Sequence, residues 1–310
     1  MTSIKARMFS FMMRNRHLLT GKLRKPVFDS STSITGFRDQ CERGAERFGK
    51  IGDDIRVNRE LIDGIPSEWL IPEGADPEKL ILYVHGGGYV SGSCNDHRGI
   101  VSKFARNTGL TCLVYEYRLA PEHPFPAAVE DSVAVWKHLL SAGLKPENIV
   151  IAGESAGGGL TLALLLALKE AKMPQPAAAV AISPWSDLSC SGESYRTKNH
   201  RSPAPLNSWF VFADHYAGGQ DKKDPLLSPL YGELKNLPPL LINSAVDDEL
   251  FDDGEAFSKK AKEAGVEVIF RAGPGMVHCY PLLAPMFPEA TEAMKEITGF
   301  IHEKLGMRIA

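Results

Sequence analysis

The chain has 310 residues, of which 44% are hydrophobic and 24% charged, and its formal net charge is −3. This composition is typical of a globular protein with one large core and excludes a disordered chain. The small negative net charge argues against a nucleic-acid partner. The cysteines form no CxxC pair, which argues against a disulfide framework or a zinc site and favours a cytoplasmic location; they are Cys41, Cys94, Cys112, Cys190 and Cys279.

The first 25 residues combine apolar and basic side chains. They contain seven Lys or Arg and no acidic residue, and the apolar residues near one helical face are Ile4, Met8, Phe11, Met12 and Leu19. Their longest apolar run is too short for a signal peptide, and no run in the chain reaches the roughly 20 apolar residues of a membrane span. Residues 1–25 therefore form either a helix on a membrane surface or, as we prefer, a lid whose apolar face covers an acyl pocket.

The middle of the chain alternates β-rich segments with helical patterns. This alternation predicts an α/β fold, with a mostly parallel sheet and helices on both faces. Residues 57–73 predict an antiparallel pair at the edge of that sheet. The other expected strands lie at 79–88, 110–118, 148–153, 178–184, 239–246 and 266–273, and two expected helices at 96–109 and 127–143.

Two segments do not fit the alternation, residues 1–50 and 190–222. Both have helical and apolar patterns, and we interpret them as two parts of a cap over the carboxyl edge of the sheet, where ligands bind in such folds. The predicted catalytic core then consists of residues 51–189 and 223–310.

Ser155 stands in the sequence Gly-Glu-Ser-Ala-Gly, between a predicted strand and a predicted buried helix. In such a G-x-S-x-G turn the serine hydroxyl is exposed on a sharp bend, and glycines at 153 and 157 avoid collisions with the neighbouring strand and helix. A five-residue motif also arises by chance, but the strand before and the helix after favour a nucleophile.

A serine hydroxyl is a poor nucleophile without a base. In folds with this turn the chain order is serine, acid, histidine, which excludes every histidine upstream of Ser155. His278 follows the last predicted strand through a Gly/Pro loop, and it is the predicted base. His200 and His215 lie in the second cap segment, and His302 lies on the final helix.

The acid that orients the imidazole has two candidates. Asp247 and Asp248 both follow the strand predicted at 239–246. Asp252 and Asp253 suit the start of the next helix, where carboxylates stabilise the helix dipole. These considerations leave the choice between Asp247 and Asp248 open.

The sequence His-Gly-Gly-Gly, which begins at His85 and Gly86, predicts an oxyanion-binding loop. A carbonyl under attack becomes an oxyanion, and amides that already point at it stabilise it. We expect those amides to come from Gly87, Gly88 and Ala156. A phosphate-binding loop is the alternative, but neither GKS/T nor GxGxxG spacing is present. We expect no metal ion and no organic cofactor.

Three motifs in this order resemble those of the hormone-sensitive-lipase-like esterases, also called bacterial family IV. They are HGGG at 85–88, YRLAPEHPFPAA at 117–128 and GESAGG at 153–158. The resemblance covers about residues 75–305. It implies the α/β-hydrolase fold with an eight-stranded, mostly parallel sheet, a helical cap, and a homodimer formed through the last strand.

The resemblance also selects the acid. Family members carry the pattern D-x-L-x-D-x-G, which here runs from Asp248 to Gly254 and assigns the role to Asp248. The chain departs from the family at Glu249, where many relatives have proline, and at Cys279, where they often have glycine. We expect Glu249 to alter the loop and not the role of its neighbour.

Other residues are expected to support the site. Glu154, beside the nucleophile, is expected either to hydrogen-bond within the site or to stabilise the N-terminus of the following helix. Arg118 and Glu122 are expected to pair. The residues expected to line the substrate pocket, with simple packing as the alternative, are Tyr89, Trp209, Phe210 and Phe212.

Together these features predict a serine carboxylesterase for short- to medium-chain acyl esters, with small lactones as further candidates. Ser155 attacks the ester carbonyl, His278 takes its proton and Asp248 orients the imidazole; water then releases the acyl-enzyme. The alternatives are an amidase or peptidase and a non-catalytic small-molecule receptor. His278 argues against a receptor, because the hormone receptors of this family lack that histidine.

Overall fold

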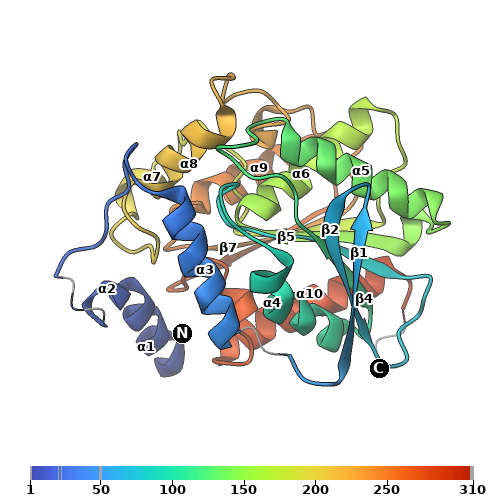
Figure 1. Cartoon of the computed structure of the whole chain (residues 1–310), viewed down its shortest axis with the longest axis horizontal. Helices are drawn as coiled ribbons and strands as arrows, with labels where there is room; N and C mark the ends of the chain where they lie inside the picture. The colour runs from blue at the N-terminus through green and yellow to red at the C-terminus, as the bar shows by residue number, and fades with distance from the viewer. Residues whose placement is uncertain (1, 20, 22, 49–50, 308–310) are drawn as a thin grey trace.

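The computed structural model describes residues 2–19, 21, 23–48 and 51–307 (Figure 1). Its centre is an eight-stranded sheet in the order β1-β2-β4-β3-β5-β6-β7-β8. The strands are β1 (Ile55–Ile62), β2 (Ile65–Pro72), β3 (Leu80–Val84), β4 (Thr111–Tyr115), β5 (Ile149–Glu154), β6 (Ala178–Ile182), β7 (Leu240–Ala245) and β8 (Val268–Gly273).

The pairing of the strands confirms the predicted α/β fold. β2 is antiparallel to both β1 and β4, and every pairing from β4 to β8 is parallel. Every residue of β3 and β5 is buried, as expected for parallel strands covered on both faces. The carboxyl ends of the parallel strands therefore share one edge of the sheet.

Helices cover both faces of the sheet, in agreement with the sequence. In Figure 1, α5, α6 and α9 lie on one face and α4 and α10 on the other, and each layer packs into its own apolar cluster. The helices are α1 (Ile4–Arg14), α2 (Arg16–Leu19), α3 (Ile34–Phe48), α4 (Cys94–Thr108), α5 (Ala127–Ser141), α6 (Ala156–Glu170), α7 (Ser194–Thr197), α8 (Ser208–Ala217), α9 (Phe251–Glu263) and α10 (Pro288–Lys304).

Helix α4 begins two residues earlier than the sequence pattern predicts. Ser93 is its N-cap, and the Ser93 and Asp96 side chains form a capping box with the backbone. The helix ends where it is expected to, at Gly109, whose φ of 67° is left-handed. The capping box explains the earlier start, because it satisfies amides that the apolar periodicity alone does not account for.

The orientation of α1 contradicts the preferred interpretation of the N-terminal segment. Its apolar face does not cover a pocket: Ile4, Met8 and Phe11 are 75%, 68% and 69% exposed. The opposite face, with Ala6 and Ser10, is buried instead. The helix is fixed this way because the Ser10 hydroxyl donates to a backbone carbonyl, and the N-cap serine binds a side chain of α10. Within the described residues, no helix has the length and apolarity needed to cross a membrane.

The two segments that the sequence predicts to be parts of a cap, residues 1–50 and 190–222, contact each other. The Phe28 amide donates to the Leu206 carbonyl at 2.8 Å, and the Leu206 amide donates to the Pro26 carbonyl at 2.9 Å. The Lys25 ammonium donates to three carbonyls of the second segment, those of Asn199, His200 and Ser202. The N-terminal segment is thus bound to residues 199–206.

The expected pair between Arg118 and Glu122 is wrong. Arg118 instead binds Asp131, at 2.8 Å, and Glu130, whereas Glu122 pairs with Arg38 of α3. Charge and proximity in sequence indicated a pair. However, the Arg118 side chain points to the first turns of α5, where both of its partners lie. Glu122 is therefore free to pair with Arg38 of α3, in the N-terminal segment.

Candidate active site

Ser155 occupies a strained turn between β5 and α6. Its φ is +57° and its ψ −123°, a conformation that L-residues rarely adopt and that requires support from the surroundings. The Ser155 amide donates to the Ile182 carbonyl, and its carbonyl accepts from the Trp185 amide, both at 2.9 Å. The turn is therefore fixed to the carboxyl end of β6 and to the loop that follows.

The glycines on either side of Ser155 are required by close approach. A Cβ at Gly157 would lie 2.1 Å from the Val84 carbonyl oxygen, and one at Gly153 would lie 2.5 Å from the Gly157 carbonyl oxygen. Both distances are shorter than any non-bonded contact. The two glycines thus allow α6 to start directly against β3 and β5.

We expect Gly157→Ala to lower the free energy of unfolding by about 3 kcal/mol, because the new methyl group must displace backbone and not a flexible side chain. Urea denaturation measures the change. The matched control is Gly299→Ala in α10, where an added Cβ meets nothing within 4 Å; we expect a gain of roughly 0.5–1 kcal/mol there. A Gly157→Ala variant as stable as the parent would contradict the close packing described above.

The imidazole of His278 is bound to one of the two candidate acids. His278 Nδ1 donates to Asp248 Oδ2 at 2.5 Å, and the Asp248 side chain is only 1% exposed. Burial disfavours the imidazolium and is the largest single influence, but the charge of Asp248, its hydrogen bond and the contribution of Cys279 together outweigh burial and raise the pKa of His278 well above its ordinary value. Asp247 points elsewhere and pairs with Arg14 and Arg201, each at 2.7 Å.

The chain at Ser155 and the chain just after His278 are both bonded to the carboxyl end of β6. The Ile182 carbonyl accepts from the Ser155 amide and from Cys279 Sγ, and the Cys279 amide donates to the Ser183 hydroxyl. Among the described residues, the Ser155 hydroxyl makes no hydrogen bond. The imidazole and carboxylate are thus joined, while Ser155 is bonded through its backbone to the same end of β6 as Cys279, and its hydroxyl is not bonded to the imidazole.

The backbone conformation of Cys279 explains why family members often have glycine at this position. Its φ is +54°, in the left-handed region that glycine adopts without strain. This conformation turns the chain immediately after His278. Cys279 keeps the turn in place through its contacts with Ile182 and Ser183.

The glycine loop after β3 presents free amides. Gly87 and Gly88 have φ values of +112° and +67°. In the described chain, no atom accepts a hydrogen bond from the amides of Gly87, Gly88 or Ala156, the first residue of α6. Phe212 packs so closely over Gly88 that an added Cβ would lie 2.4 Å from its ring. Free amides of this kind are what an oxyanion requires.

Glu154 connects the nucleophile turn to the glycine loop. Its Oε1 accepts from the Gly86 amide at 2.7 Å and lies 2.9 Å from His97 Nε2. His97 Nδ1 in turn binds Asp96. Burial lowers the pKa of His97, but the charges of Glu154 and Asp96 more than compensate and raise it to about 10. His97 is therefore a buried cation between two carboxylates.

The sequence did not indicate this role of His97. The chain order excluded it as the base for Ser155, and no other function was assigned to it. The one available signal was the proximity of two histidines to the glycine loop, and spacing alone does not separate their roles. His85, the other one, stacks on Tyr117 with ring centroids 4.1 Å apart, and its Nδ1 binds the Gly86 carbonyl. Burial lowers the pKa of His85 to about 4, so this ring is neutral.

We expect His97→Gln to lower the free energy of unfolding by roughly 3 kcal/mol near neutral pH, because it leaves two buried carboxylates without their cation. The pKa of His97 is raised on folding from about 6.5 to about 10. Its contribution is therefore complete below pH 6.5 and is lost as the pH rises through 10. Denaturation of parent and variant between pH 6 and 10 measures this.

The control for that experiment is His138→Gln. His138 is partly exposed and lies 4.0 Å from Glu60, so its loss should cost less than about 0.5 kcal/mol. A difference between parent and His97→Gln that stays constant or grows toward pH 10 would contradict a charged His97.

The four aromatic residues expected in the pocket have different positions. Trp209 contacts the His278 ring edge-on with centroids 5.5 Å apart, and Phe212 lies against the glycine loop. Phe210 is 39% exposed and packs near Tyr195. Tyr89 is buried and stacks on Tyr216 in the core. Only Trp209 and Phe212 lie next to the candidate catalytic residues.

Glu249 does more than alter its loop. Its Oε2 accepts from Trp209 Nε1 at 2.8 Å, and the residue is 2% exposed. Burial raises the pKa of this carboxyl group. Because Trp209 contacts His278, the residue that replaces the relatives' proline holds an aromatic wall of the site. In the sequence, the one sign that Glu249 is unusual was its departure from the family pattern. No pattern indicated that its partner would be Trp209.

Two hollows of the surface differ in their relation to this site. One, of about 370 Å³, is lined by Arg14, Phe28 and Phe37 among others. Both phenylalanines contact Phe212, with ring centroids 5.7 and 5.5 Å apart. Through Phe212 and Gly88, this hollow adjoins the glycine loop, and Arg14 joins it to the loop of Asp247 and Asp248.

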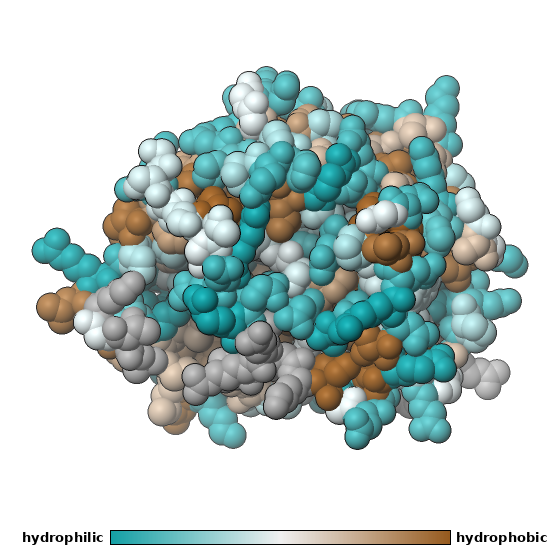
Figure 2. Space-filling model, in the orientation of Figure 1, coloured by the Kyte–Doolittle hydropathy of each residue, from teal (hydrophilic) through white to brown (hydrophobic). Residues whose placement is uncertain are grey.

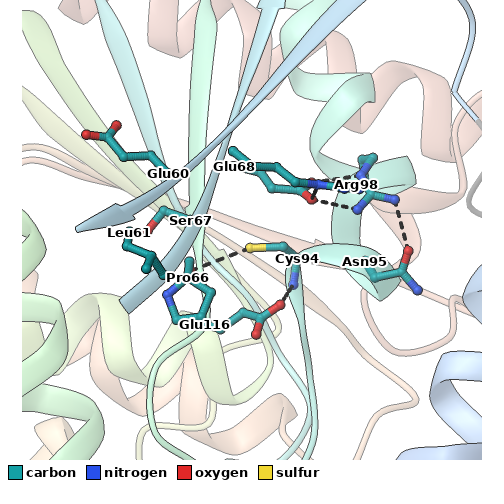
Figure 3. Close-up of a pocket in the computed structure, with 10 residues that line it drawn as sticks. Glu60, Leu61, Pro66, Ser67, Glu68, Cys94, Asn95, Arg98 and Glu116 are labelled. Atoms are coloured by element: carbon teal, nitrogen blue, oxygen red, sulfur yellow. Dashed lines mark hydrogen bonds and ion pairs between the residues drawn. The ribbon is translucent and has the colours of Figure 1, made fainter. Parts of the chain in front are cut away.

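The other hollow, of about 550 Å³, lies over β2 and the start of α4 and contains none of the candidate catalytic residues (Figure 3). Its polar groups bind one another: Arg98 binds Glu68 and Asn95, and Glu116 accepts from the Cys94 amide. Because these polar groups are paired with one another, they do not indicate a catalytic or binding role for this hollow. Within the described residues, no cluster of three or more His, Cys, Asp or Glu side chains has the geometry of a metal site.

The sheet order, the strained serine after β5 and the histidine after β8 define an α/β-hydrolase. A family model described as "alpha/beta hydrolase fold" matches residues 81–282. An acetyl-hydrolase of Streptomyces hygroscopicus is 40% identical over 273 residues, which cover 86% of this chain and 88% of that protein.

Two solved structures are also similar. An esterase of the bacterial hormone-sensitive lipase family is 37% identical, with a TM-score of 0.88 over 98% of this chain and 99% of that one. The protein EstE5, in a crystal soaked with p-nitrophenyl butyrate, is 37% identical, with a TM-score of 0.89 over 98% of this chain and 100% of that one. The chain belongs to the hormone-sensitive-lipase-like esterases of the α/β-hydrolase fold, and it is a carboxylic ester hydrolase.

Proposed function

We propose that the chain hydrolyses short- to medium-chain acyl esters through an acyl-enzyme, with Ser155 as nucleophile, His278 as base and Asp248 as the acid. The observation that carries this proposal is the 2.5 Å bond from His278 to Asp248, at the sheet edge where Ser155 is fixed. The bond leaves Nε2 as the nitrogen that accepts a proton.

In the reaction, a small movement of the serine rotamer or of His278 brings the Ser155 hydroxyl to Nε2. The hydroxyl then attacks the carbonyl, and its proton passes to His278, whose positive charge Asp248 stabilises. The amides of Gly87, Gly88 and Ala156 receive the oxyanion, and Glu154 keeps the glycine loop in place through Gly86. The alcohol leaves with the proton, and water releases the acid by the reverse path.

The aromatic residues beside the site and the names of similar proteins support the proposed substrate range. Trp209 and Phe212 are buried against the candidate catalytic residues, and the phenylalanines of the adjoining hollow extend an apolar wall. Aromatic side chains next to the candidate catalytic residues suit an apolar acyl chain. The similar proteins include one named for acetyl hydrolysis and one soaked with a butyrate ester. In this proposal residues 1–50 and 190–222 form the cap, and the exposed apolar face of α1 is the part of it that does not face the site.

The test is a series of p-nitrophenyl esters from acetate to laurate, with γ-butyrolactone as a further substrate and the matching p-nitroanilides as the amidase control. We expect kcat/KM to be highest between acetate and hexanoate and to fall at least tenfold at laurate. Faster cleavage of the anilides would favour an amidase. The absence of turnover with every ester would favour a receptor.

A further inference from the structure

A stripe of large apolar side chains is exposed along α1. Ile4, Met8, Phe11 and Met12 are 75%, 68%, 69% and 44% exposed. Their spacing places them on one face of the helix. Beyond the helix, Leu18 and Leu23 are also exposed, at 51% and 91%. Single exposed apolar residues are ordinary, but a contiguous set of this kind marks an interaction surface.

Basic side chains border the stripe on both sides. With about 3.6 residues per turn, Lys5 lies next to one border of the stripe and Arg7 next to the other. Both are exposed, and neither forms an ion pair with any described residue. Residues 1–25 contain no aspartate or glutamate. The surface is thus apolar in the middle and cationic at its rims.

The helix cannot turn to bury this stripe, because its other face is bound to the core. The Ser3 hydroxyl donates to Glu289 at 2.8 Å, the Ser10 hydroxyl to the Gly275 carbonyl at 3.0 Å, and Arg14 to Asp247 at 2.7 Å. Figure 1 shows α1 and α2 at the outer side of the molecule. The stripe is therefore presented outward by a fixed helix.

We propose that this face of α1 docks on the surface of an anionic lipid bilayer. A helix with an apolar stripe and basic rims lies in the plane of the interface, with its apolar side chains among the acyl chains and its cations at the phosphates. A second copy of the chain fits less well, because two such faces would bring like charges together at both rims.

The position of α1 connects docking with access to the candidate active site. Arg14, at the end of the helix, lines the hollow that adjoins the glycine loop, and Gly275, to which the helix is bound, begins the loop that carries His278. Docking places this hollow close to the lipid surface, where poorly soluble esters collect. The docking itself does not require the proposed catalytic residues.

The experiment is flotation of the full chain with phosphatidylglycerol vesicles and, separately, with phosphatidylcholine vesicles. We expect binding to the anionic vesicles only, and a loss of at least tenfold in partitioning between 50 mM and 500 mM salt, because ions screen the basic rims. The double variant Met8→Ser/Phe11→Ser and the double variant Lys5→Gln/Arg7→Gln should each weaken partitioning at least tenfold.

The matched control is Leu61→Ser, since Leu61 is as exposed as Phe11, at 69%, but lies at the end of β1. It should bind as the parent does, and hydrolysis of a soluble ester should be equal in all these proteins. Equal partitioning to both vesicles, or equal losses with Leu61→Ser, would overturn the proposal. So would a dimer in solution that Met8→Ser/Phe11→Ser dissociates, because the stripe would then be covered by a second copy. On the face of the molecule drawn in Figure 2, hydrophilic residues predominate and hydrophobic ones form separate patches.

Discussion

Replacement of Ser155 by alanine is expected to lower kcat for p-nitrophenyl butyrate by about 10⁵-fold or more, to the level of the assay background. In the proposed mechanism the Ser155 hydroxyl is the only protein group that forms a covalent bond to the substrate. Removal of a nucleophile from such a triad costs on the order of 10⁶ in kcat. Stopped-flow measurement at high enzyme concentration should also show no burst of p-nitrophenol.

The control must separate chemistry from folding. Ser155 has a strained backbone that the surrounding bonds to Ile182 and Trp185 maintain, and these bonds involve only main-chain atoms. The alanine variant should therefore unfold within about 1 kcal/mol of the parent. Ser141→Ala, at the exposed end of α5, should retain full activity. A Ser155→Ala protein that still turns over at a tenth of the parent rate would remove the nucleophile from the proposal.

The sequence was most informative where a residue's role depends on its immediate neighbours in the chain. The fully buried strands β3 and β5 and the glycines around Ser155 follow from local rules, since period, length and close approach are properties of short segments. The order of serine, acid and histidine then excluded the histidines upstream of Ser155, and the predicted positions of those downstream, in a cap segment or on the final helix, left His278.

It was less informative where a role depends on a partner from elsewhere in the fold. The stripe of α1 was expected to cover an acyl pocket as a lid, but hydrogen bonds from Ser10 and Ser3 turn the opposite face inward. Likewise, no spacing rule links Glu249 to Trp209 or His97 to Glu154. Each of these contacts joins segments that only the tertiary structure brings together.

Asp247 and Asp248 show the same limit at a single position. Spacing and residue type do not distinguish two adjacent aspartates that follow one strand. The resemblance to a family pattern was needed to choose between them. The structure distinguishes them by their partners: one faces His278, while Arg14 and Arg201, from two distant segments, bind the other. This difference has a kinetic consequence that a pair of matched variants measures.

Asp248→Asn is expected to lower kcat by about 10⁴-fold, because the amide no longer holds the imidazole in the tautomer that accepts the serine proton. Asp247→Asn removes the same charge one residue away and should change kcat less than about threefold, since ion pairs with partly exposed arginines contribute little. Equal losses in the two variants would contradict the assignment of the acid.

The pH dependence of the residual rate gives an independent test of the same contact. His278 must be neutral to accept a proton, so the rate falls as the pH drops through its pKa. The charge of Asp248 raises that pKa. In Asp248→Asn the acid limb of kcat/KM should therefore move to lower pH, whereas in Asp247→Asn it should stay near its original position. An acid limb that does not move in Asp248→Asn would mean that the group titrating in this limb is not the imidazole bound to Asp248.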